Sequence, residues 1–163
     1  TLDITSGIDS TYDSYEFHFV NIHPASNGYQ FQFQVNASGQ TGFNEVMTTT
    51  KFRAYHNEAD SYTSLEYVTT GDQAQGVAYQ SLAPSVGNAN DESTSGVLTL
   101  YAPSSTTYVK HFLSRCNVHW TSSYTMDYHN AGYINVTAAI DEISFKFSAG
   151  NIDDGTIKMF GVS

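Results

Sequence analysis

The fold of this chain is decided by its closing stretch, Ile143-Ser144-Phe145-Lys146-Phe147-Ser148, in which apolar and polar residues alternate. Alternation with a period of two is typical of a strand that buries one face. Turn-forming residues follow from Gly150 to Gly155, and they are followed by the extended run Thr156-Ile157-Lys158-Met159-Phe160-Gly161-Val162. The stretch therefore predicts a hairpin at the C-terminus, which favours an antiparallel sheet.

Outward from this stretch, the same alternation recurs along the chain. In its clearest case the odd positions from 29 to 35 are aromatic or Val, and the even positions from 30 to 36 are Gln or Asn. Asn27-Gly28 before it is the strongest short hairpin signal in the chain. Further extended segments are predicted over 2–4, 15–22, 43–56, 61–68, 77–82, 97–101, 108–120, 124–128 and 133–136. A turn is predicted over 129–132, and residues 137–140 are compatible with one helical turn.

These segments predict a single all-β domain over residues 1–163. We expect an antiparallel β-sandwich, jelly-roll-like, with about ten strands and little helix. An up-and-down barrel is the competing architecture, although the long and uneven loops suit the sandwich better. The longest break in the pattern, 84–95, has the length at which loops are usually functional or mobile.

Composition excludes two classes of partner. The 163 residues include 16 Asp and Glu against 6 Lys and Arg, which gives a net charge of −10. Such a surface repels phosphate backbones and anionic lipids, so we expect neither nucleic-acid nor membrane binding. The single cysteine, Cys116, excludes an intrachain disulfide and is expected to be a buried, inert thiol.

No signature of catalysis or of cofactor binding is present in the sequence. It contains no GxSxG, HExxH, CxxC, GxGxxG or GxxxxGK motif. The best local metal candidate sets His56, Glu58 and Asp60 at alternate positions, but it lacks the Gly and the terminal Glu of a calcium loop. We therefore expect no enzyme activity, no catalytic residues, no cofactor and no metal.

The residues expected at the surface are rich in amide, hydroxyl and aromatic side chains, which form adaptable hydrogen bonds and stack on rings. Two uses fit this surface: contacts between copies of the chain, or binding of neutral carbohydrate as in a lectin. The predicted self-assembly face consists of Gln30, Gln32, Gln34, Asn36 and Phe160. The predicted ligand-contact loops carry His56, Glu58, Asp60, Asp91 and Glu92.

The run from Ile140 to Val162 resembles the C-terminus of a family of β-sandwich virion proteins of tailed bacteriophages, especially marine ones. The shared features are an I-x-x-I-x-F strand, an S-x-G-N-x-x-x-G-T turn and a last strand that ends in aromatic-Gly-hydrophobic. Further similar segments are Thr5-Ser6-Gly7-Ile8-Asp9-Ser10-Thr11-Tyr12, Asp72-Gln73-Ala74-Gln75-Gly76 and Pro103-Ser104-Ser105-Thr106-Thr107-Tyr108-Val109-Lys110-His111.

The resemblance implies a structural protein on the exterior of the virion, without enzyme activity. Capsid decoration, head fibre and tail appendage all remain open, and a tail or fibre location would add host attachment. The expected partners are copies of the chain itself, with a trimer favoured by the resemblance, other virion proteins, and a host-surface glycan.

Overall fold

The computed structural model describes residues 1–163, and it is built from eleven antiparallel strands without a helix. It therefore has no helix that could cross a membrane. The all-β antiparallel class is confirmed, with eleven strands where about ten were predicted. The strands are β1 (Leu2–Ile4), β2 (Ser14–Pro24), β3 (Tyr29–Ala37), β4 (Met47–Asn57), β5 (Thr63–Tyr67), β6 (Gln80–Val86), β7 (Thr94–Tyr101), β8 (Lys110–Trp120), β9 (Tyr124–Ile134), β10 (Ile140–Phe147) and β11 (Ile152–Val162).

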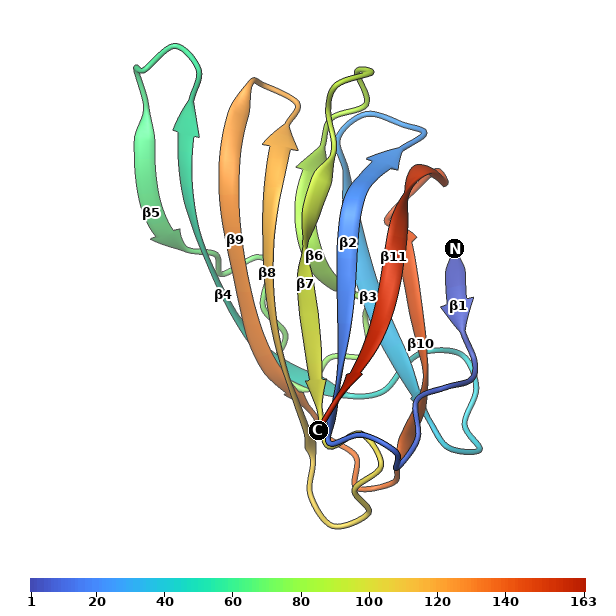
Figure 1. The fold of residues 1–163 in the computed structure, drawn as a ribbon. Helices are drawn as coiled ribbons and strands as arrows, with labels where there is room; N and C mark the ends of the chain where they lie inside the picture. The colour runs from blue at the N-terminus through green and yellow to red at the C-terminus, as the bar shows by residue number, and fades with distance from the viewer.

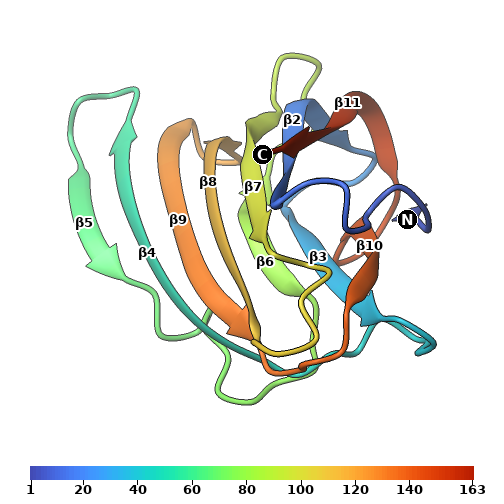
Figure 2. The ribbon, with the colours of Figure 1, turned by 60° about the horizontal axis from the view of Figure 1, so that its bottom comes forward.

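All eleven strands belong to one open sheet that has two parts. The small part has the order β1-β10-β3-β6, and the large part has the order β5-β4-β9-β8-β7-β2-β11. A single pair, Val86 with Trp120, joins β6 of the small part to β8 of the large part. In Figure 1, β6, β3 and β10 of the small part lie behind β7, β2 and β11. Figures 1 and 2 both show β4 and β5 extending beyond the small part. The jelly-roll connectivity stays a prediction.

The core lies between the two parts and is rich in phenylalanine. Phe19 of β2 meets Phe31 of β3 with ring centroids 5.1 Å apart, and it meets Phe145 of β10 at 5.3 Å. Phe17 meets Phe145 at 5.5 Å. Since β2 is not hydrogen-bonded to β3 or β10, these contacts show that the two parts pack face to face. In the extended segment predicted over 15–22, the alternate positions Tyr15, Phe17 and Phe19 are all buried.

Two hairpins predicted from the sequence are wrong in the same way. The closing hairpin would pair β10 with β11, yet β10 pairs with β1 and β3, and β11 pairs with β2. Likewise, the strands on either side of Asn27-Gly28 are β2 and β3, which lie in different parts of the sheet. Both turns have the local chemistry of a hairpin, including a positive φ at Gly28 and Gly150. Each instead carries the chain from one part to the other, because the apolar faces of the flanking strands pack on each other.

Two further local predictions are also wrong. The predicted turn over 129–132 is the middle of β9, where Gly132 allows a close approach: an added Cβ would lie 2.7 Å from the carbonyl oxygen of Thr48. The helical turn predicted over 137–140 does not form. The buried ammonium of Lys110 instead donates to the carbonyl oxygens of Val136, Thr137 and Ala138, at 3.2, 2.8 and 2.6 Å.

Candidate functional site

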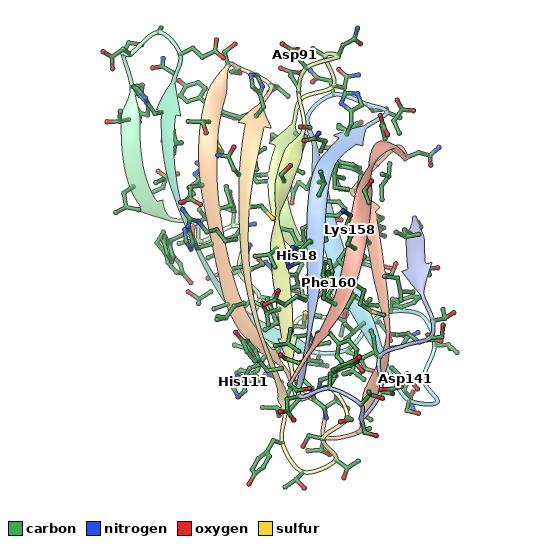
Figure 3. The ribbon with its side chains drawn as sticks, viewed as in Figure 1. His18, Asp91, His111, Asp141, Lys158 and Phe160 are labelled. Atoms are coloured by element: carbon green, nitrogen blue, oxygen red, sulfur yellow. The ribbon has the colours of Figure 1, made fainter.

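The broadest candidate site is the outer face, by which we mean the side of the large part that faces away from the small part. On β8 the alternation is regular, since Phe112, Ser114 and Cys116 are buried whereas Leu113 and Arg115 are exposed. Even-numbered residues from 48 to 56 of β4, from 14 to 20 of β2 and from 156 to 162 of β11 point outward in the same way. Figure 3 shows labelled members of this face, His18, Lys158 and Phe160, over β2 and β11.

One register row of the outer face crosses all seven strands of the large part. From β5 to β11 it contains Tyr67, Phe52, His129, Arg115, Val97, His18 and Lys158. The rings of Phe52 and His129 stack with centroids 4.6 Å apart and 7° between their planes. The ring of His18 packs edge-on against Phe160 at 4.9 Å. The row is a band of aromatic and cationic side chains, held in place by the strand register.

The charges at the centre of this band are paired. Nε and Nη2 of Arg115 each donate to an oxygen of Asp127 at 2.9 Å, and Asp127 also lies 3.2 Å from Nε2 of His129. The hydrogen bonds from Arg115 are the main cause that lowers the pKa of Asp127, and the same bonds raise the pKa of Arg115. Both groups stay charged near neutral pH and cancel each other.

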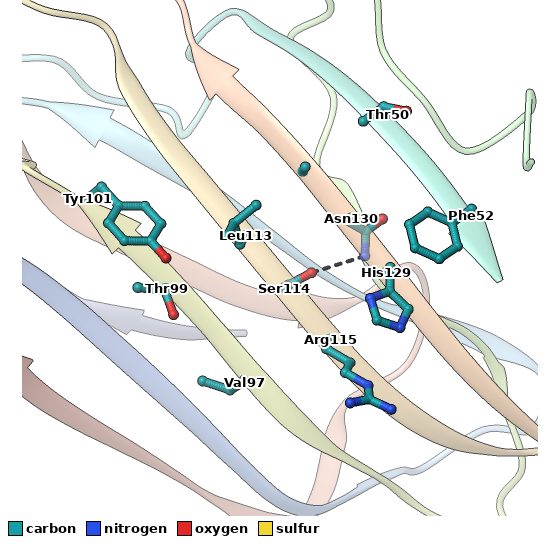
Figure 4. A pocket seen from close by; sticks show the side chains of 11 residues that line it. Thr50, Phe52, Val97, Thr99, Tyr101, Leu113, Ser114, Arg115, His129 and Asn130 are labelled. Atoms are coloured by element: carbon teal, nitrogen blue, oxygen red, sulfur yellow. Dashed lines mark hydrogen bonds between the residues drawn. The ribbon is translucent and has the colours of Figure 1, made fainter. Parts of the chain in front are cut away.

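The outer face is hollowed between β4 and β7. A cavity of about 310 Å³ opens there, within the lower range of small-molecule sites. Figure 4 shows its lining, in which Leu113 lies between the rings of Phe52 and Tyr101 and polar groups stand around them. Two neighbouring cavities of about 470 and 360 Å³ follow the same face. These hollows give the face room for side chains or for a small ligand.

The predicted ligand-contact loops meet at one end of the sheet, around His119 of β8. Glu58 from the β4–β5 loop lies 3.6 Å from Nε2, and Glu92 from the β6–β7 loop lies 3.3 Å from Nδ1. Glu92 stands outside hydrogen-bond geometry, so the buried Nδ1 has no hydrogen-bond partner. Because the two nitrogens are on different sides of the ring, the carboxylates do not converge. His56 instead pairs with the exposed Asp60 at 3.0 Å.

Four aromatic rings lie beside these loops, and we call them the aromatic cluster: Tyr55, Tyr62, Tyr124 and Trp120. Trp120 and Tyr124 meet at 5.2 Å, Tyr124 and Tyr55 at 5.9 Å, and Tyr55 stacks on Tyr62 at 5.7 Å. Tyr62 is 52% exposed, so its ring is open to solvent. The side-chain oxygen of Asn57 accepts hydrogen bonds from the backbone N–H of Ser61 and of Tyr62, which fixes the loop that carries this ring.

Two acidic segments that are far apart in the sequence, the β6–β7 loop and the start of β11, also come together. A wholly polar cavity of about 520 Å³ is lined by Asn21, His23, Asn90, Asp91, Glu92, Ser93, Asp153 and Asp154. Figure 3 labels Asp91 at this end of the molecule. No group of three or more His, Cys, Asp or Glu side chains in the structure is arranged to hold a metal ion. The approach of the two segments could not be predicted from the sequence, because it depends on the pairing of β2 with both β7 and β11.

The predicted self-assembly face does not exist as one exposed surface. Gln34 and Asn36 are buried, and Nε2 of Gln34 donates to the carbonyl oxygen of Glu45 at 3.0 Å. Nδ2 of Asn36 donates to Glu142 at 2.7 Å. Gln30 is exposed and Gln32 is half-buried, on the small part of the sheet. Phe160 is 46% exposed and belongs to the outer face, so it is separate from the amide row.

A charged side chain that the sequence did not single out lies in the interior. Lys51 of β4 is 2% exposed, donates to the carbonyl oxygen of Ser81 at 3.2 Å and lies over the ring of Tyr128 at 4.6 Å. Burial lowers the pKa of Lys51 to about 8. The neighbouring Cys116 is buried as predicted, and burial raises its pKa to about 12. Neither group reaches solvent, so neither belongs to a surface site.

No protein-family model, no curated protein and no solved structure matches this chain. The function must therefore be argued from the surfaces described above and from the resemblance of the sequence segments.

Proposed function

We propose that this chain is a non-catalytic structural protein on the exterior of a tailed phage particle, as capsid decoration, fibre or tail appendage. The observation that carries the proposal is the outer face, a broad exposed sheet surface with aromatic and aliphatic side chains and equal numbers of acidic and basic residues. Exposed apolar patches of this kind mark interaction surfaces. The resemblance of the closing run supports the virion location.

Quantitative mass spectrometry of gradient-purified particles tests this proposal. The expected result is tens of copies or more per particle, at a constant ratio to the major capsid protein across the gradient fractions. The host lysate from the same infection serves as the control. Recovery from the lysate with none in the particles would refute a virion role.

A second candidate function, a lectin-like carbohydrate-binding module, is favoured by the aromatic cluster. Its exposed Tyr62 ring can stack on a sugar ring, and Glu58 of the same β4–β5 loop can accept hydrogen bonds from hydroxyl groups. The loop is held in place by hydrogen bonds from Glu58 N–H to the Ser123 carbonyl oxygen and from Asn57 N–H to the Tyr62 carbonyl oxygen. A site preorganised in this way loses less entropy on binding.

Titration with host-surface polysaccharide, together with a glycan array, tests the second function. The variant Tyr62→Ala should bind about fivefold more weakly, since an aromatic contact contributes about 1 kcal/mol. The matched control is Tyr108→Ala, because Tyr108 is 73% exposed on a different loop. Absence of binding at millimolar sugar, or equal affinity of the two variants, would exclude a carbohydrate site here.

A further inference from the structure

The charge of this protein is unevenly distributed over its surface. The outer face carries two acidic residues, Glu16 and Asp127, and two basic residues, Arg115 and Lys158. It is therefore neutral when its histidines are neutral, and the whole net charge of −10 resides on the rest of the chain. Two copies brought together through most other surfaces would bring acidic groups into contact. The outer face is the surface on which a second copy meets no net repulsion.

Exposed apolar side chains gather on the same face. Of the fourteen large hydrophobic residues that are exposed in the structure, eight point outward from it. They are Val20, Phe52, Leu65, Tyr67, Tyr101, Leu113, Phe160 and Val162. Covering such side chains is favourable at about 25 cal/mol per Å² of apolar surface. The face thus combines the apolar content of an interface with the absence of net charge.

The size of the face fits a stable contact between proteins. β8 alone contributes His111, Leu113, Arg115 and Asn117 to four successive rows. Seven strands about 4.8 Å apart and four rows about 6.7 Å apart cover roughly 600 Å² in projection. A standard interface buries about 800 Å² on each partner, and side chains that project from the sheet add to the projected area.

We propose that the outer face packs against the outer face of a second copy of this chain. The proposal deepens the proposed function, on which it rests, by naming the first partner of the exterior protein. Two sheets stacked in this way would lie about 10 Å apart with their strands about 30° from parallel, as in other face-to-face sheet pairs. The contact is isologous, so it forms a two-fold dimer and not the trimer that the resemblance favours.

The arrangement of side chains fits a two-fold axis that runs along β8. β8 is the central strand of the seven, with three strands on each side. The axis therefore places β5 over β11 of the other copy and β4 over β2. Apolar groups then cover apolar groups at both ends, because Phe52, Leu65 and Tyr67 lie on β4 and β5, and Val20, Phe160 and Val162 lie on β2 and β11.

Near the axis each chain places Leu113 against Leu113 of the other copy. Arg115 lies one row away, and its bidentate bond to Asp127 of the same chain prevents two unpaired like charges from meeting. A salt bridge kept intact on burial avoids the cost of a buried, unpaired charge. The neighbouring cavity of about 310 Å³ beside Leu113 gives the side chains of the second copy room to enter.

Sedimentation analysis of the purified chain tests the proposal. Wild type should sediment as a dimer at micromolar concentration, and Leu113→Glu should dissociate at least about 100-fold more readily, since it places two carboxylates near the axis. Leu113 is 50% exposed, so this change leaves the fold intact. Tyr108→Glu, outside the face, is the matched control and should stay dimeric. A wild-type monomer, a trimer, or equal behaviour of the two variants would overturn the proposal.

Crosslinking of introduced cysteines is a second test, which detects the contact between two copies directly and does not rely on a variant that dissociates. Because Cys116 is buried, an introduced cysteine is the only reactive thiol. Sheets about 10 Å apart are too distant for a disulfide, so a short bis-maleimide that spans about 8 Å is the crosslinker. It should join Leu113→Cys rapidly into a dimer, whereas Gln30→Cys, exposed on the small part, should not be crosslinked. Faster crosslinking through Gln30 would assign the contact to the amide row and overturn the proposal. A monomer that binds purified capsids through the outer face would also overturn it, yet would leave the virion role standing.

Discussion

Replacing the buried Lys51 by Met should make the protein more stable at neutral pH. Burial lowers the pKa of this ammonium from 10.5 to about 8, which corresponds to a cost of about 3 kcal/mol for keeping it charged in the folded state at pH 7. Lys51→Met keeps the length of the side chain and removes the charge. It also removes the bond to the Ser81 carbonyl oxygen, which still accepts from Gln80 Nε2 at 3.4 Å. We expect a net gain of about 2 kcal/mol at pH 7.

The sign of the pH dependence follows from the lowered pKa. Between pH 8 and pH 10.5 the unfolded chain holds the Lys51 proton and the folded chain has lost it, so the unfolding free energy rises with pH in this window. The unfolding free energy of the wild type should rise by roughly 1 kcal/mol from pH 7 to pH 9 through Lys51, and that of Lys51→Met should lack this rise. Urea unfolding at both pH values measures it, with the half-buried Lys146→Met as control. An equal change in wild type and Lys51→Met would refute the reasoning.

Three other predictions concern the packing of the sheet. Cys116 should react with a thiol reagent only after unfolding, because burial raises its pKa to about 12; rapid labelling of native protein would show that β8 opens. Gly96→Ala should cost about 2 kcal/mol in a thermal melt, since the new Cβ would clash with the Arg115 carbonyl oxygen. An unchanged melting temperature would contradict this packing. Asp127→Asn should lower the unfolding free energy by about 0.5 kcal/mol at pH 7, and the two proteins should converge in stability as the pH falls through the lowered pKa of Asp127. Urea unfolding at pH 7 and pH 3 measures this. A difference that stays constant between the two pH values would show that the pair with Arg115 contributes nothing.

Strand content could be predicted from the sequence because alternation is a local property. The odd positions from 15 to 19 of β2 and from 31 to 37 of β3 are apolar and lie in the core. Partner choice is not local. Asn27-Gly28 has the residues of a tight hairpin, yet its flanking strands bury their apolar faces against each other across the core, with Phe19 against Phe31. A turn sequence does not distinguish pairing edge to edge from packing face to face.

The candidate site was harder to predict than the fold, for a related reason. A row of amides predicts an exposed surface. Gln34 and Asn36 instead form hydrogen bonds with backbone groups of a neighbouring segment, and the sequence alone does not predict this contact. Conversely, the outer face is assembled from single outward residues on seven strands, such as Phe52, Leu113 and Phe160. No local sequence pattern marks any of them as part of a shared surface, and only the strand register brings them together.

The central claim is that this chain is displayed in many copies on the outside of a phage particle. Cryo-electron microscopy of intact particles, with antibody labelling of the same preparation, tests it most directly. We predict density for the eleven-stranded domain outside the capsid or on the tail, at symmetry-related positions, with antibody bound to unbroken particles. Particles that bear no such density and bind antibody only after disruption would contradict the account.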